Sequence, residues 1–200
     1  MRQFALGLFL ITASFNLWAA GAAVQVHMET NKGRIVLEVY PDKAPKTVAN
    51  FLQYIDEAFY SNTIFHRVIN GFMIQGGGFD TNYHRKSTRP AIINEADNGL
   101  KNERGSIAMA RTLDPHSATS QFFINVVDND FLDHKGKNPR GWGYAVFGKV
   151  VEGMEIVDMI KAIPTIAAGP FPKDVPRDPV IIIKISRAGA QAISPAKPAN

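Results

Sequence analysis

The stretch that most constrains the fold is residues 64–80, which has the features of a β-hairpin followed by a bend. Residues 64–69 and 72–75 are rich in β-branched and aromatic side chains, which favour strands. Asn70 and Gly71 between them tolerate the positive φ angles of a tight turn. Three consecutive glycines, residues 76–78, then allow a bend, a bulge or a close approach of other groups. We therefore expect a mainly β protein organised around this hairpin.

Two polar side chains, Arg67 and Gln75, lie within this apolar hairpin. Because strand residues two apart share a face, Arg67 is expected to share one with Phe65 and Ile69, and Gln75 with Met73. One interpretation is that Arg67 extends its charged head into water while its stem covers apolar surface. The other is that these residues build an apolar pocket with two fixed polar groups, as sites for small ligands and peptides usually are.

The rest of the chain predicts short strands and two helices. Apolar residues at helical spacing predict a helix from Pro45 to about Ala58, which the proline can open, and a second at 152–162. Five prolines predict an irregular segment at 164–179. Further strands are expected at 24–30, 34–40, 106–110, 121–126, 144–151 and 180–185. This pattern fits an antiparallel barrel with a helix at each open end.

The N-terminal 22 residues have the layout of a secretory signal peptide. Arg2 precedes an apolar run, and small residues then allow cleavage after Ala22. The alternative is an uncleaved anchor, but polar residues interrupt the apolar run, which is short for spanning a membrane. We predict a signal peptide at 1–22, a single domain at 23–187 and a disordered Ala/Pro-rich tail at 188–200.

The composition excludes several chemistries. The chain has no cysteine, and therefore no disulfide, thiol nucleophile or thiolate metal site. It has no G-x-S-x-G or H-E-x-x-H motif, and its five histidines lack the spacing of a metal site. The net charge of +4 comes from scattered Lys and Arg, which favours a mildly basic surface over a nucleic-acid-binding patch. We predict no metal and no cofactor.

Four motifs are specific enough to suggest a family. They are F-H-R-V-I-x-G-F-M-I-Q-G-G from Phe65, S-Q-F-F-I-N from Ser120, F-L-D from Phe131 and Y-A-V-F-G from Tyr144. Together they resemble the cyclophilins, the peptidyl-prolyl cis-trans isomerases, and with the leader they resemble the bacterial periplasmic members. The resemblance covers about residues 24–186. It implies a closed eight-stranded antiparallel barrel capped by two α-helices.

The resemblance also assigns roles to individual residues. The catalytic residues that it implies are Arg67, Phe72 and Gln75, with Arg67 as the donor to the proline nitrogen. The substrate-binding residues that it implies are Met73, Ala110, Arg111, Gln121, Phe123, Phe131, Leu132 and Tyr144. From the residues alone, Phe72, Phe123 and Leu132 would instead be assigned to an ordinary core, and Met73 could fill a gap in it. Gln75 could satisfy an internal backbone group, and Gln121 could face solvent.

Four positions depart from the family pattern. Many members have Trp at the position of Phe131, and that indole helps to hold cyclosporin, so we expect weak cyclosporin binding with turnover retained. Tyr144 replaces a histidine at the pocket rim, and Arg111 replaces the asparagine of an Ala-Asn pair, a change that could alter substrate preference. Asn70 replaces a proline in the turn, remote from the chemistry.

The function that the resemblance implies is prolyl isomerisation in folding secreted polypeptides. We expect a periplasmic monomer that acts on proline-containing chains and has no nucleic-acid partner and no membrane association after signal cleavage. One alternative is a binding module in which the same groove holds proline peptides and rate enhancement is incidental. Another is a nucleic-acid-binding β-barrel, which would need a basic stripe with exposed aromatics that the sequence does not show.

Overall fold

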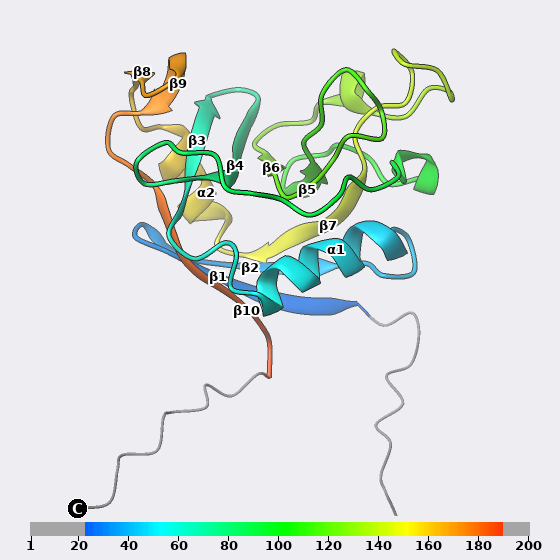
Figure 1. Cartoon of the computed structure of the whole chain (residues 1–200), viewed down its shortest axis with the longest axis horizontal. Coiled ribbons are helices and arrows are strands. Elements are labelled where there is room, and N and C mark those ends of the chain that lie inside the picture. The colour runs from blue at the N-terminus through cyan, green and yellow to red at the C-terminus, as the bar shows by residue number, and fades with distance from the viewer. Residues whose placement is uncertain (1–22, 190–200) are drawn as a thin grey trace, which may run out of the picture.

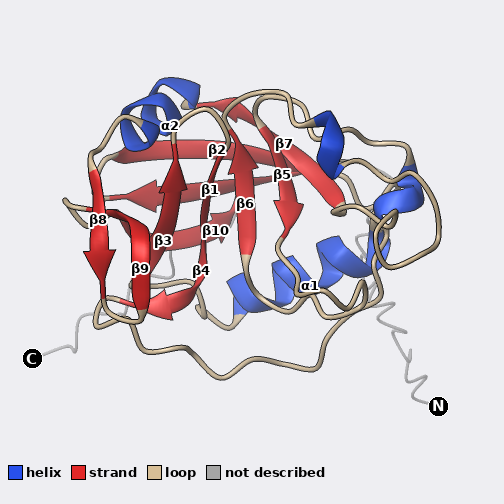
Figure 2. Ribbon diagram, turned by 90° about the horizontal axis from the view of Figure 1, so that it is seen from above, coloured by secondary structure: helices blue, strands red, loops and turns tan. Residues whose placement is uncertain are grey.

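The fold is a closed antiparallel barrel of eight strands, seen here in a computed structural model that describes residues 23–189. The barrel strands are β1 (Val24–Thr30), β2 (Gly33–Val39), β3 (Thr63–Ile69), β4 (Met73–Asp80), β5 (Ser106–Met109), β6 (Phe122–Asn125), β7 (Val146–Glu152) and β10 (Ile181–Arg187). Around the barrel they follow the order β1-β10-β3-β4-β6-β5-β7-β2. Helices α1 (Pro45–Asp56) and α2 (Met154–Lys161) lie on opposite sides of the barrel (Figures 1 and 2). The predicted architecture is confirmed.

The predicted signal peptide and the tail from residue 190 onward lie outside the described residues. Of the predicted tail, only Ala188 and Gly189 are described, and the Ala188 amide still donates a hydrogen bond to the Gln25 carbonyl. Between residues 23 and 189, no helix combines the length and the apolar character needed to cross a membrane.

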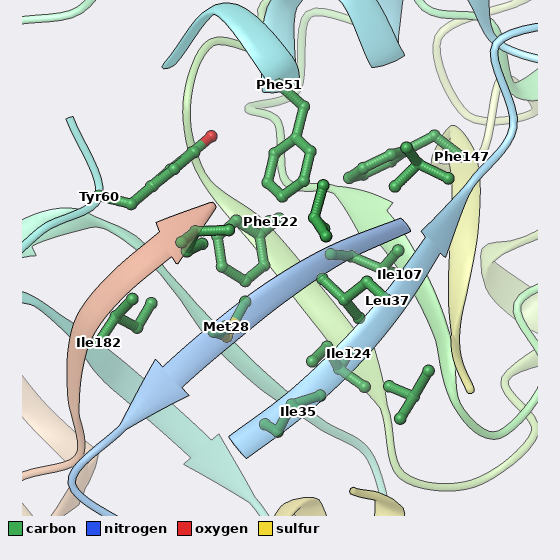
Figure 3. Packing of buried hydrophobic residues seen from close by; sticks show 14 of the residues in the cluster. Met28, Ile35, Leu37, Phe51, Tyr60, Ile107, Phe122, Ile124, Phe147 and Ile182 are labelled. Carbon is green, nitrogen blue, oxygen red and sulfur yellow. The ribbon is translucent and has the colours of Figure 1, made fainter. Parts of the chain in front are cut away.

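The barrel interior is filled by side chains from all around the sheet and from both helices. Phe122 of β6 packs its ring against Phe51 of α1, Tyr60 and Phe65, with ring centroids 5.5–6.1 Å apart (Figure 3). On β2, the predicted face of Ile35, Leu37 and Val39 points inward, as period-two alternation requires. Such a core supplies most of the stability of a barrel, because it removes large apolar surfaces from water.

Helix α1 forms as predicted but ends earlier. Pro45 opens it, and Val48, Phe51 and Ile55 point into the core. The helix stops at Asp56 rather than near Ala58, because Ala58 has a φ of +52°, which turns the chain toward β3.

The segment 164–179 is not irregular, so that prediction is wrong. It forms a two-stranded hairpin of β8 (Thr165–Ala168) and β9 (Phe171–Pro176), which lies beside β3 (Figure 1). Prolines are tolerated because a two-stranded ribbon has free edges, where a missing N–H group leaves no acceptor unpaired. Pro176 is at the strand end, opposite Thr165, and a register shift relieves the pairing in the middle of the ribbon.

The prediction that Phe65 and Arg67 share one face of the strand is also wrong. The pairing of β3 with β4 shifts register on both sides of Phe65, and each shift resets the alternation of side chains. Phe65 and Val68 therefore both point into the barrel core, while Arg67 points to the outside. Strand β4 also continues through the three glycines to Asp80, rather than ending at them.

Gly77 shows why the chain needs glycine in this bulged region. Its φ is +78°, and a Cβ atom there would lie 2.8 Å from the ring of Phe122 and 2.9 Å from that of Tyr60. Any larger residue would thus meet both backbone strain and a clash with the core. The remaining boundaries agree with the predicted ones to within about two residues, which is the usual uncertainty of element ends.

Candidate active site

A cavity of about 100 Å³ opens on the outside of the barrel. Strands β3, β4 and β6, the turn before β4, the segment after β5 and the loop before β7 all contribute to it. Its lining residues are Arg67, Phe72, Met73, Gln75, Ala110, Arg111, Phe123, Leu132 and Tyr144. Each of these belongs to the set that the sequence singled out, so the fold gathers in one place residues up to 77 positions apart.

The apolar wall of the cavity is a second cluster, separate from the barrel core. Met73, Phe123 and Leu132 are buried in it. Phe122 and Phe123 are neighbours on β6 and point to opposite sides of the sheet, the first into the barrel and the second into this cluster. The ring of Tyr144 meets that of Phe123 edge-on, with centroids 5.6 Å apart. Phe123 is therefore a pocket residue and not part of the barrel core.

The polar side of the cavity is a chain of three side chains. Arg67 donates from Nη1 to Oε1 of Gln75 over 3.4 Å, and Gln75 donates from Nε2 to Oε1 of Gln121 over 3.0 Å. The Arg67 side chain is 42% exposed, and its guanidinium lies 5.9 Å from the centroid of the Phe72 ring. The arginine is thus held at the edge of an apolar pocket with part of its surface open.

Two of the expected site residues are not in the cavity lining. Gln121 does not line the cavity, but it accepts a hydrogen bond from Gln75, which does. Phe131 lies in a short 3-10 helix, Asp130–Leu132, with its side chain largely exposed. Its ring stacks on that of Phe72 at a centroid distance of 5.6 Å, so it forms the outer rim of the site rather than its floor.

Comparison with known proteins now decides the family. Residues 25–187 match the family described as "Cyclophilin type peptidyl-prolyl cis-trans isomerase/CLD". This chain is a member of the cyclophilin family.

Several relatives support this assignment. The chain is 59% identical to peptidyl-prolyl cis-trans isomerase B of Escherichia coli over 80% of its own length and 98% of that protein. It is 52% identical to peptidyl-prolyl cis-trans isomerase A of Dickeya dadantii, over 86% of this chain and 88% of the relative. A crystal structure of a Cryptosporidium parvum cyclophilin type isomerase superimposes with a TM-score of 0.67 at 30% identity, over 83% and 98% of the two chains.

Asp174 is a residue of this cyclophilin's site that sequence reasoning missed. It lies on β9, and its Oδ2 is 3.8 Å from Nε of Arg67, a different nitrogen from the one that donates to Gln75. Its φ is +67°, a conformation that Asp adopts more readily than most residues. The prediction that 164–179 is irregular gave no reason to place Asp174 near Arg67. The turn signal of Gly169-Pro170 between two short β-prone runs could have indicated the hairpin.

A buried polar network, also missed, holds the cavity wall in place. Asn129 donates from Nδ2 to the carbonyl of Phe72 over 3.0 Å and to Oδ1 of Asn125 over 2.7 Å. Asn125 in turn donates to Oδ1 of Asn102 and to Oγ of Ser106. Buried amides need such partners, and the network ties the turn carrying Phe72 to β6 and β5. Asn102 and Asn129 lie in loops, where asparagine gives no sequence signal of burial.

His66 lies beneath the β8–β9 hairpin, beside the catalytic candidate Arg67. Its ring packs against those of Phe79 and Phe171, with centroids 4.7 and 5.1 Å away. Burial lowers the pKa of His66 to about 4, with the charge of Arg67 adding to the shift and the Ile64 backbone opposing it. The imidazole is therefore neutral at pH 7 and serves as an aromatic filler.

Replacing His66 by phenylalanine is expected to reduce the acid sensitivity of folding. The unfolded imidazole binds a proton below its ordinary pKa of about 6.5, whereas the folded protein binds it only below about 4. Between these values the unfolded state holds more protons, so the free energy of unfolding falls as the pH falls. From about pH 7.5 to about pH 5 this group should account for about 2 kcal/mol.

Urea unfolding of the wild type and of His66→Phe at both pH values measures this effect. The variant keeps the ring contacts with Phe79 and Phe171 but cannot titrate, so its loss of stability toward low pH should be smaller by that amount. An equal loss in both proteins would contradict the assignment of a depressed pKa to His66.

Proposed function

We propose that this cyclophilin accelerates rotation about X–Pro bonds by stabilising the twisted amide with Arg67. The barrier to this rotation, about 18–20 kcal/mol, comes from the partial double bond between the carbonyl carbon and nitrogen. At the top of the barrier resonance is lost and the prolyl nitrogen gains a lone pair. A guanidinium aimed at that nitrogen binds the twisted amide more strongly than the planar one, and this difference accelerates the reaction.

The observation that carries this mechanism is the placement of the Arg67 guanidinium beside an apolar cavity. Arginine keeps its charge at any relevant pH and donates from a rigid fork. Gln75 and Asp174 contact it at two different nitrogens, which supports a fixed orientation before substrate arrives. The apolar wall of Met73 and Phe123 would accept the proline ring and exclude water, and water exclusion strengthens the interaction of the guanidinium with the nitrogen.

The two glutamines are suited to hold the substrate backbone. Oε1 of Gln121 accepts from Gln75, which fixes the orientation of its amide group. Its Nε2 makes no hydrogen bond to any residue within 23–189, so it is available to a peptide carbonyl next to the proline. Ala110 and Arg111 also line the cavity.

The test of this proposal is the isomerisation rate of a short X–Pro peptide with the wild type and with Arg67→Ala. Catalysis through Arg67 requires that the variant lose most of the rate enhancement. If the cellular role is only to hold proline peptides, the wild type and Arg67→Ala should restore a cell that lacks the protein equally well. This comparison separates the binding role from catalysis.

We also propose that the protein acts in the periplasm on secreted polypeptides as they fold, and that it is a monomer there. The support for the periplasmic location is the layout of residues 1–22, with one basic residue, an apolar run and small residues before position 23. Sequencing the N-terminus of the protein recovered from a periplasmic extract tests this. A mature protein that begins near Ala23 is expected, and an intact Met1 in the cytoplasmic fraction would contradict it.

Weak cyclosporin binding is a further expectation for this site. Phe131 is 65% exposed and stacks on Phe72, but its ring carries no hydrogen-bond donor. Phe131→Trp adds an indole N–H at the rim and should raise cyclosporin affinity about ten-fold, because one added hydrogen bond with some apolar contact contributes about 1.4 kcal/mol. Titration calorimetry of both proteins measures this. Equal affinities would contradict the role given to position 131.

A further inference from the structure

A second cavity, of about 230 Å³, adjoins the first. Gln75, Ala110 and Arg111 line both of them, so the two form one continuous groove across β4, β6 and the segment after β5. The remaining residues that line the second cavity are Phe79, Arg85, Thr112, Ser117, Thr119 and Gln121. A peptide whose proline occupies the first cavity would therefore place a neighbouring residue in the second.

Both charged residues of the second cavity are arginines whose charges are not neutralised. Arg85 is exposed, and among residues 23–189 its guanidinium has no ion-pair or hydrogen-bond partner. Arg111 donates from Nε to the carbonyl of Gly143 over 2.9 Å and from Nη1 to that of Thr112 over 2.8 Å. Its guanidinium also lies over the Tyr144 ring, 4.6 Å from the centroid. These neutral groups fix the position of the guanidinium but do not compensate its positive charge.

Asp80 and Asp114, which lie within two positions of lining residues in the sequence, accept hydrogen bonds from backbone amides. The donors are the amides of Asn82 and His84 for Asp80, and the amide of His116 for Asp114. No carboxylate lines either cavity within the described part of the chain. The groove therefore offers a fixed cation and a free cation to whatever enters it.

We propose that the second cavity selects an acidic side chain located upstream of the substrate proline, with Arg85 and Arg111 as specificity-determining residues. This inference rests on the proposed function, in which Gln121 and Ala110 hold the residues before the proline. A carboxylate suits the site because arginine binds it through two parallel hydrogen bonds. Arg111, held by backbone carbonyls, loses little freedom on binding such a group.

The test uses three peptides that differ at one position, two residues before the proline, which carries Glu, Gln or Lys. Line-shape or exchange NMR measures kcat/KM directly, so no coupling protease imposes its own charge preference. At low salt, kcat/KM for the Glu peptide should be about five-fold higher than for the Gln peptide, as expected for exposed charge pairs. Salt at about 0.5 M should bring the ratio close to one, because it screens such pairs. A second peptide set places the same residues three positions before the proline.

Charge reversal at the free arginine makes the test decisive. Arg85→Glu should invert the preference toward the Lys peptide, and Arg85→Lys should retain the preference for Glu. The matched control is Arg177→Glu, which makes the same change of charge at an exposed arginine that lines neither cavity. Ratios between peptides are compared on one protein preparation, so a general loss of activity cancels.

The outcomes separate this inference from the mechanism. Turnover of all three peptides at equal rates by the wild type, or an unchanged ratio in Arg85→Glu, overturns the acidic preference and leaves the isomerase mechanism intact. If no peptide is turned over, the mechanism fails, and dissociation constants of the same peptides still measure the preference. An oligothymidylate that displaces the Glu peptide at the same concentration would show a general anion site and overturn the inference.

Discussion

Arg67→Ala should lower kcat/KM for an X–Pro peptide by about 10²–10³-fold, the usual cost of removing one donor that acts on the transition state. The Arg67 guanidinium lies at the apolar wall of the first cavity and donates to Gln75. Alanine leaves the proline pocket intact, so peptide binding should change less than the rate. The loss should appear mainly in kcat, because the lost interaction forms in the twisted amide.

The barrel should survive this substitution. Arg67 is partly exposed, and its ion pair with Asp174 spans 3.8 Å, a kind of contact that contributes up to about 1 kcal/mol. Arg67→Lys is the matched control, since it keeps the charge but loses the planar fork, and it should retain intermediate activity. Circular dichroism and urea unfolding establish that both variants are folded. Near-wild-type turnover by a folded Arg67→Ala protein would refute the mechanism.

Phe122→Ala should have the largest effect on stability, lowering the free energy of unfolding by about 3–5 kcal/mol. The ring is fully buried and touches the rings of Phe51, Tyr60 and Phe65 at the centre of the barrel. Removing it leaves a cavity among stiff aromatic neighbours that cannot collapse to fill the space, and it also removes edge-to-face contacts. Urea denaturation followed by tryptophan fluorescence measures the change.

Phe131→Ala makes the same chemical change at a ring that is largely exposed. Its stability cost should stay within about 0.5 kcal/mol, because surface substitutions away from special features rarely exceed that. A loss of less than about 1 kcal/mol in Phe122→Ala would show that the ring is not the centre of the core.

Local elements could be predicted because their causes are local. The turn at Asn70-Gly71, the amphipathic helix beginning at Pro45 and the alternation of β2 each depend on residues within a few positions of one another. The prediction that failed on β3 depended on strict alternation. The register shifts around Phe65 break that alternation, and they are imposed by the pairing partner β4, which the pattern of β3 alone does not contain.

The sequence alone determined the family resemblance, the residues that line the first cavity and, except for the hairpin within 164–179, the kinds of element. The tertiary structure alone decided which charges meet there. Asp174 reaches Arg67 because the β8–β9 hairpin packs on β3, and Arg111 stacks on Tyr144 because the loop before β7 returns to the end of β5. These contacts join residues 33 and 107 positions apart. Only tertiary packing brings them together, since the β8–β9 hairpin lies against β3 and strand β5 pairs with β7. The physical reason is that the sheets and the hairpin remove apolar surface from water by packing on one another.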